Sequence, residues 1–241
     1  MKILIVNDDG MHAAGLIPLV RWAREKGEVT VVVPKEEQSG MGHSVKFMKA
    51  FSAKETAIAP DVTVWAVDST PADCVRFGIL ALKQTYDLVI SGVNRGMNMG
   101  TDILYSGTVG AASEAVNLDH KALAVSTDYP GYADVTARLD EVWDFVQEHR
   151  LLEIHSAYNI NIPHDGQRIR IVRHGGHYYG DGIDYAGDNI WLPVGLPLEK
   201  MAEDPDLDMV AAKNGCITIM PLTIDRTCLA VYEKIKHLSR E

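Results

Sequence analysis

The chain has 241 residues, of which 46% are hydrophobic and 23% are charged, and these values are typical of a folded globular protein. They argue against intrinsic disorder, a collagen-like repeat and a disulfide-dense scaffold. The formal net charge of -10 disfavours binding to a nucleic-acid duplex, because an acidic surface repels the phosphate backbone.

The amino terminus and the cysteines indicate the compartment. Residues 3–6 form an apolar run far shorter than the core of a secretory signal, and no later run approaches the roughly 18 residues that span a bilayer. The three cysteines include no CxxC pair, so we expect neither a disulfide framework nor a cysteine zinc site. We therefore expect a soluble, cytoplasmic protein that makes no membrane contact.

The first half of the chain alternates apolar strands with helices. The strands are predicted at residues 1–6, 29–33, 87–90 and 122–125. Helices are expected over 16–23 and 70–82, the second with Thr70 as its N-cap and Pro71 in its first turn. Because these strands are continuously apolar, they indicate a three-layer α/β/α fold with a Rossmann-like, mostly parallel sheet whose functional residues lie at the carboxyl ends of the strands.

The second half continues with an amphipathic helix over about 132–149, a strand at 216–222 and a closing helix at 227–237. Residues 178–205 are rich in Gly, Pro and Asp with little periodicity, a length unusual for a structureless connection. This segment is interpreted either as a lid or as an oligomer contact, and Trp191, Leu192 and Leu196 within it are expected to be exposed.

Polar residues follow the first three strands at the predicted functional edge. Asp8 and Asp9 end the first strand, and Gly10 lets the backbone turn so that both carboxylates can face one cation, although Asp-Gly is also ordinary turn chemistry. A glycine-rich loop at 38–44 follows the second strand, where the alternative is a plain surface loop. The loop at 91–100 follows the third, and its length suggests function.

The helix that begins after Ser106, Gly107 and Thr108 offers unpaired N–H groups and a dipole that suit a phosphate. In the alternative interpretation Ser106 is only an N-cap and Gly110 only a close-packing residue. Together, the oxygen-bearing strand ends and this helix terminus predict a magnesium- or manganese-type site that holds a phosphate ester.

Five motifs follow one another along the first half of the chain. They are Asn7-Asp8-Asp9-Gly10, Gln38-Ser39-Gly40, Thr70-Pro71-Ala72-Asp73-Cys74, Ser91-Gly92-Val93-Asn94 with Gly96, Asn98 and Gly100, and Tyr105-Ser106-Gly107-Thr108-Val109-Gly110-Ala111-Ala112. These motifs resemble the SurE survival-protein family of 5′-nucleotidases, and the segments at 159–163 and 218–225 look like later signatures of that family.

The resemblance implies a divalent-metal-dependent phosphatase that releases phosphate from nucleoside 5′-monophosphates, with 3′-monophosphates and short polyphosphate as further candidate substrates. It implies one Mg²⁺ or Mn²⁺ per subunit, held by the predicted metal residues Asp8, Asp9, Ser39 and Asn94. It also implies a homodimer or homotetramer whose subunits exchange carboxy-terminal elements. We expect one domain over 1–241, with 1–127 as the metal- and phosphate-binding core and 178–241 as a hairpin and helix extension for oligomerisation.

In this interpretation Asp9 is the candidate general base and Asp8 chiefly a ligand. The predicted phosphate residues are Asn98, Ser106, Gly107 and Thr108. We expect a change at Gly107 to weaken phosphate binding and to leave manganese affinity little altered, because none of the four metal residues belongs to this turn. An aspartyl-phosphate route is disfavoured by the adjacent aspartates but stays open. The rival function is a nucleotide-sensing module that binds in the same crevice without turnover.

Several residues keep open assignments. His174 and His177 flank a Gly-Gly pair and are interpreted as loop residues or substrate contacts more readily than as zinc ligands. His12 and His43 are candidates for proton transfer or are surface histidines. Arginines at 168, 170 and 173 lie on one face of an expected strand or pair with the acidic surplus.

Overall fold

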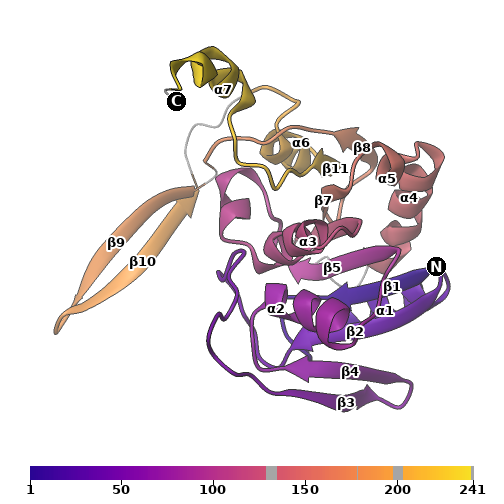
Figure 1. Cartoon of the computed structure of the whole chain (residues 1–241). Helices are drawn as coiled ribbons and strands as arrows, with labels where there is room; N and C mark the ends of the chain where they lie inside the picture. The colour runs from indigo at the N-terminus through magenta and orange to yellow at the C-terminus, as the bar shows by residue number, and fades with distance from the viewer. Residues whose placement is uncertain (129–134, 178, 198–202, 240–241) are drawn as a thin grey trace.

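In the computed structural model, which describes residues 1–128, 135–177, 179–197 and 203–239, a nine-stranded sheet runs through the molecule (Figure 1). Its order is β3-β4-β2-β1-β5-β6-β7-β11-β8. The strands are β1 (Lys2–Val6), β2 (Glu28–Pro34), β3 (Ala53–Ala59), β4 (Val62–Val67), β5 (Leu88–Arg95), β6 (Ala122–Thr127), β7 (Ala157–Ile162), β8 (Arg168–Ile171) and β11 (Cys216–Pro221). The run from β4 to β7 is parallel, so the predicted three-layer, mostly parallel fold is confirmed.

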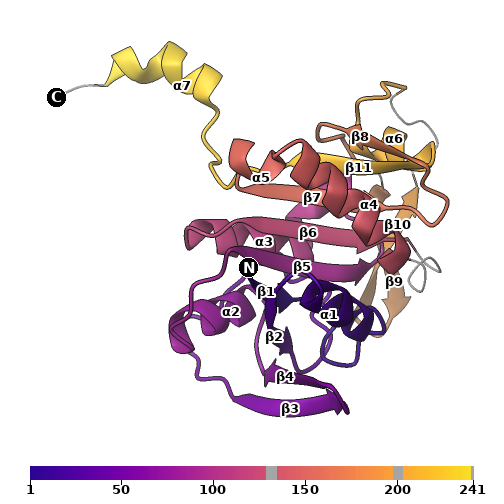
Figure 2. The ribbon, with the colours of Figure 1, turned by 90° about the vertical axis from the view of Figure 1, so that its right-hand side faces the viewer.

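Helices cover both faces of the sheet (Figure 2). They are α1 (Leu16–Arg24), α2 (Pro71–Arg76) with a π-helical turn at Phe77–Ala81, a 3-10 turn at Gly100–Leu104, α3 (Gly107–Asn117), α4 (Val135–Glu148), α5 (Leu151–Ile154), α6 (Asp208–Lys213) and α7 (Leu229–Ile235) with a 3-10 turn at Lys236–Leu238. Thr70 caps α2 as predicted, because its hydroxyl accepts the N–H of Asp73 at 3.1 Å. The predicted start of α4 at 132–134 lies outside the described residues.

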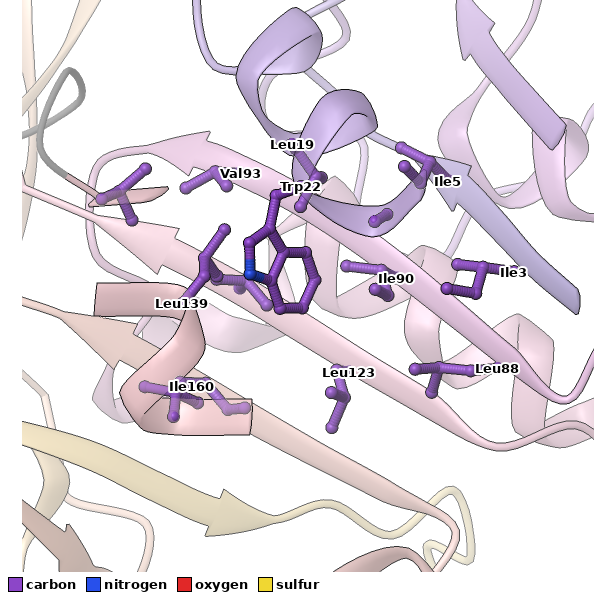
Figure 3. Packing of buried hydrophobic residues seen from close by; sticks show 14 of the residues in the cluster. Ile3, Ile5, Leu19, Trp22, Leu88, Ile90, Val93, Leu123, Leu139 and Ile160 are labelled. Atoms are coloured by element: carbon purple, nitrogen blue, oxygen red, sulfur yellow. The ribbon is translucent and has the colours of Figure 1, made fainter. Parts of the chain in front are cut away.

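Two hydrophobic clusters fill the space between the sheet and the helices. Alternate residues of β1 face opposite sides, so Ile3 and Ile5 pack with α1 and α4, whereas Leu4 and Val6 pack with α2 and α3. Figure 3 shows Trp22 among the side chains of the first cluster. This burial on both faces explains why the central strands are continuously apolar.

The extension near the carboxyl end consists of a hairpin and α7. Within the described residues of the segment 178–205, β9 (Tyr179–Gly187) pairs antiparallel with β10 (Ile190–Pro197), and this hairpin projects from the sheet (Figure 1). Trp191 is 60% exposed and Leu192 52%, while the side chain of Leu196 is outside those described. Strand β11 is integral to the sheet, since it lies between β7 and β8. Among the described helices, none is both long and apolar enough to cross a membrane.

The central sheet predicts a test of the fold. Ile90 is 1% exposed, so the Ile90→Ala variant should lose about 2–5 kcal/mol of unfolding free energy in urea titrations through lost burial and a residual cavity. Ile154→Ala, at a side chain 73% exposed, is the matched control and should change little. Equal losses in both variants would contradict the assigned core.

Candidate active site

The carboxyl ends of β2, β1 and β5 meet at one edge, because these strands are neighbours and parallel. The loop after β1 is tied to the loops on both sides. The N–H of Gln38 donates to the carbonyl oxygen of Asp8 at 2.7 Å, and the N–H of Arg95 donates to Asp9 Oδ2 at 3.0 Å. The structure therefore brings the three loops that carry the predicted metal residues to one place.

The turn that carries both aspartates is shaped by Asn7 and Gly10. Asn7 is buried, its Nδ2 donates to the carbonyl oxygen of Gly10 at 2.9 Å, and its Oδ1 accepts the N–H of Gly10 at 3.2 Å. Gly10 has a φ of +86° and packs against the loop after β2, where a Cβ would lie 3.0 Å from the carbonyl carbon of Glu36. The Asn-Asp-Asp-Gly sequence is thus required by the shape of the turn as well as by its carboxylates.

Asp8 is buried against the first turn of α3. Its Oδ1 accepts the hydroxyl of Thr108 at 2.5 Å, and its Oδ2 accepts the N–H of Thr108 at 3.2 Å. Burial raises the pKa of Asp8 from 3.8 to about 6, against the opposing hydrogen bond from Thr108 and with a further increase from the charge of Asp9. The helix terminus that the sequence assigns to a phosphate therefore already faces a protein carboxylate.

This contact links the two sets of predicted residues. A Cβ on Gly107 would lie 2.9 Å from Asp8 Cβ, so a larger residue there would displace a predicted metal residue. The turn at 106–108 is therefore in direct contact with Asp8, although none of the four predicted metal residues belongs to this turn. Ser106 is the N-cap of α3, as its structural interpretation predicts, because its hydroxyl accepts the N–H of Val109 at 3.1 Å.

Ser39 and Asn94 complete the predicted metal set from the two flanking loops. Ser39 is exposed, and its hydroxyl donates to Glu37 Oε1 at 2.6 Å. Asn94 is half-buried at the end of β5, and its Nδ2 donates to the carbonyl oxygen of Gly96 at 2.6 Å. With Nδ2 engaged in this way, Oδ1 is the atom of Asn94 that suits a cation.

Asn98 lies in a buried polar network at the ends of β5, β6 and β7. Its N–H donates to Asn161 Oδ1 at 2.8 Å, and its Nδ2 donates to the hydroxyl of Ser126 at 2.8 Å. Its carbonyl oxygen accepts the side-chain amides of Asn159 and Asn161, at 2.8 and 2.9 Å. The Asn-Ile-Asn-Ile-Pro motif at 159–163 therefore anchors the loop at 96–100. The role of Asn98 in holding phosphate stays a prediction.

The donor chemistry fits a hard divalent cation. The four predicted metal residues offer carboxylate, hydroxyl and carboxamide oxygens, the ligand types that Mg²⁺ and Mn²⁺ prefer. Within the described part of the chain, the Asp8 carboxylate forms no ion pair although it is 4% exposed. A bound cation would compensate this buried charge. Across the described residues no group of three or more His, Cys, Asp or Glu side chains could hold a metal, and the predicted set contains only two such residues.

Two of the histidines and two of the arginines with open assignments contact residues other than the four predicted metal residues. His174 and His177 are exposed, and His177 Nδ1 is 3.1 Å from the hydroxyl of Thr101. Arg170 and Arg173 pair with Asp206 and Asp204, at 2.8 and 2.5 Å, so the pairing with the acidic surplus is confirmed for these two.

Sequence reasoning did not assign two buried carboxylates near the site. Asp208 accepts the N–H groups of Gly100, Gly175 and Met209, which ties the loop after β5 to α6. Glu114, on α3, contacts His43 and Arg76. Glu114 is the only acidic residue of α3, which consists mainly of small residues, and this feature could have marked it as functional. Nothing in the local sequence marks Asp208.

Fold and site together define an α/β protein with oxygen-bearing side chains at adjacent strand ends beside a helix amino terminus. The family described as Survival protein SurE matches residues 3–181. The chain belongs to the SurE family.

Relatives and a solved structure extend this match over nearly the whole chain. The 5′-nucleotidase SurE of Pelotomaculum thermopropionicum is 38% identical over 248 residues, covering 99% of this chain and 95% of its own. The 5′/3′-nucleotidase SurE of Serratia proteamaculans is 35% identical, covering 98% and 95%. The crystal structure of the SurE protein from Aquifex aeolicus superposes with a TM-score of 0.83 at 31% identity and covers 99% of both chains.

The buried charge of Asp8 predicts a pH-dependent stability in the presence of a chelator. Because its folded pKa of about 6 lies above the ordinary 3.8, the wild-type protein loses stability as pH rises through this window. As pH rises from about 4 to about 7, the free energy of unfolding of Asp8→Asn should therefore increase relative to that of the wild-type protein, by up to about 3 kcal/mol.

The control for this measurement is Asp61→Asn at an exposed ion pair. The hydrogen bond from Arg21 holds the pKa of Asp61 below its ordinary value, so any trend there should have the opposite sign. A parallel trend in both variants, or none in Asp8→Asn, would contradict the assigned burial of Asp8.

Proposed function

We propose that this chain is a phosphatase that hydrolyses nucleoside 5′-monophosphates with the help of a divalent cation. The observation that carries the proposal is the buried Asp8 carboxylate, held between the charge of Asp9 and the amino terminus of α3. The predicted enzyme class agrees with the names of the relatives, which are 5′-nucleotidases. A sensing module without turnover is not favoured by these names.

The cation would be held by Asp8, Asp9, Ser39 and Asn94. Their oxygen chemistry supports Mg²⁺ or Mn²⁺, one per subunit. A divalent cation supplies a Lewis acid that polarises a phosphoryl oxygen. The choice of cation, like activity on 3′-monophosphates or short polyphosphate, is part of our proposal.

The residues of the chain divide the remaining work. Asp9 is less buried than Asp8, so it is the better candidate to accept a proton from water. The first turn of α3, capped by Ser106, provides a positive dipole end for the phosphate beside Gly107 and Thr108. Asn98 holds its loop at this edge through the network with β6 and β7.

Free Cys74, Cys216 and Cys228 support a cytoplasmic location.

Phosphate release from a panel of nucleoside monophosphates and p-nitrophenyl phosphate tests the proposal. Activity should vanish in excess chelator and return with Mn²⁺ or Mg²⁺. Asp9→Asn should lower kcat by about 10²–10⁴-fold with an unchanged circular dichroism spectrum, because it removes the base and one charge from the site. Asp61→Asn, far from the site, is the control and should retain activity. Full activity in chelator would refute the metal requirement, whereas nucleotide binding without phosphate release would support the sensing alternative.

We also propose that the chain assembles as a homodimer or homotetramer through the hairpin and α7. A seven-residue helix and an isolated two-stranded hairpin are marginal in water by themselves. No described residue of α7 is buried, and it exposes Leu229, Val231, Tyr232 and Ile235. A second subunit would cover these apolar side chains.

Light scattering at about 10 µM tests the assembly. The wild-type chain should have at least twice the monomer mass, and the double variant Tyr232→Glu with Ile235→Glu should dissociate because charges would enter the interface. Ile154→Glu, at another exposed apolar position, is the control and should leave the mass unchanged. A monomeric wild-type chain would contradict the proposal.

A further inference from the structure

Glu114 is a buried carboxylate that joins three elements around the site. It lies on α3 and is 3% exposed. Its Oε1 accepts from Arg76 Nη1 on α2 at 2.8 Å, and its Oε2 accepts from His43 Nε2, in the loop after β2, at 2.7 Å. Burial by itself would raise the pKa of Glu114, but the hydrogen bonds from His43 and Arg76 outweigh burial and hold it below its ordinary value. The carboxylate is therefore ionised and fully engaged.

The loop that carries His43 is also seated directly on α3. The N–H of Gly42 donates to the carbonyl oxygen of Tyr105 at 2.9 Å. At Gly110 a Cβ would lie 2.3 Å from the carbonyl oxygen of Gly42, so the helix needs glycine there to admit the loop. Backbone packing and the Glu114 contacts thus hold the same stretch of loop against the same helix.

Ser39 lies four residues before His43 in this loop, and α3 is the helix whose first turn bonds Asp8. One rigid helix therefore contacts Asp8 at its first turn and the Ser39 loop farther along. Removing one partner of a buried ion pair destabilises a protein, whereas replacing the whole pair with apolar side chains of similar volume is often neutral for stability. The charged arrangement at Glu114 therefore suggests a task other than stability alone.

We propose that His43, Arg76 and Glu114 are positioning residues that hold the Ser39 loop on α3, so that Ser39 and Asp8 are set for one divalent cation. This inference rests on the proposed metal site. Residues of this kind, which orient ligands without touching the metal, typically alter metal affinity by about 10–100-fold. Their loss should therefore weaken cation binding in the absence of any substrate.

Calorimetric titration of the full chain with Mn²⁺, without nucleotide, tests the proposal. His43→Ala should raise the Mn²⁺ Kd by about 10-fold or more. His43→Gln, whose side-chain amide can donate to Glu114, should restore most of the affinity. Hydrogen exchange at residues 38–44 should become faster in His43→Ala and return toward the wild-type rate in His43→Gln. Arg170→Ala removes an exposed ion pair away from the site and is the matched control.

The outcomes separate this inference from the proposed function. A wild-type chain that binds no Mn²⁺ refutes the metal site itself. A wild-type chain that binds Mn²⁺, together with a Kd in His43→Ala within twofold of it, overturns the positioning role while leaving the metal site intact. Should His43→Ala fail to fold, Arg76→Gln and Arg76→Lys replace it, and a Kd that is unchanged in Arg76→Gln overturns the proposal.

Discussion

The rest of the site depends on the burial of the Asp8 carboxylate against the first turn of α3. Placing a carboxylate out of water is unfavourable unless hydrogen bonds or a cation compensate it, and here Thr108 supplies two hydrogen bonds. The parallel strands β2, β1 and β5 bring Ser39, Asp9 and Asn94 to the same edge. A divalent cation would supply the compensation that Asp8 still lacks, so the way the helix meets the sheet supports the proposed metal site.

This contact joins the proposed metal and phosphate sites. Gly107 lies against Asp8, and Thr108 donates to it, so the turn assigned to phosphate also shapes a metal residue. The same helix carries Glu114 and, through His43, the loop of Ser39. A rigid helix that touches each part can keep the site organised before a substrate arrives, which lowers the cost of ordering it.

Residue patterns predict the central sheet and the loops of the site well, but not the contacts between distant residues. Strands β1, β2, β5 and β6 each contain a short, largely apolar run, so they are recognised without tertiary information. Strand β3 reads Ala-Lys-Glu-Thr-Ala-Ile-Ala, with few β-branched residues, and its place at the sheet edge depends on pairing with β4. Asn161 and Glu114 bond partners that are tens of residues away, at Asn98 and His43. The sequence marks Asn161 by its motif and does not assign Glu114, and in both cases only the fold identifies the bonding partner.

Anomalous diffraction from crystals soaked in Mn²⁺ tests the central claim most directly. The account predicts one strong peak at the ends of β2, β1 and β5, bound by oxygens of Asp8, Asp9, Ser39 and Asn94. A peak bound by other residues, or an empty edge at saturating Mn²⁺, would show that the buried Asp8 carboxylate serves another purpose.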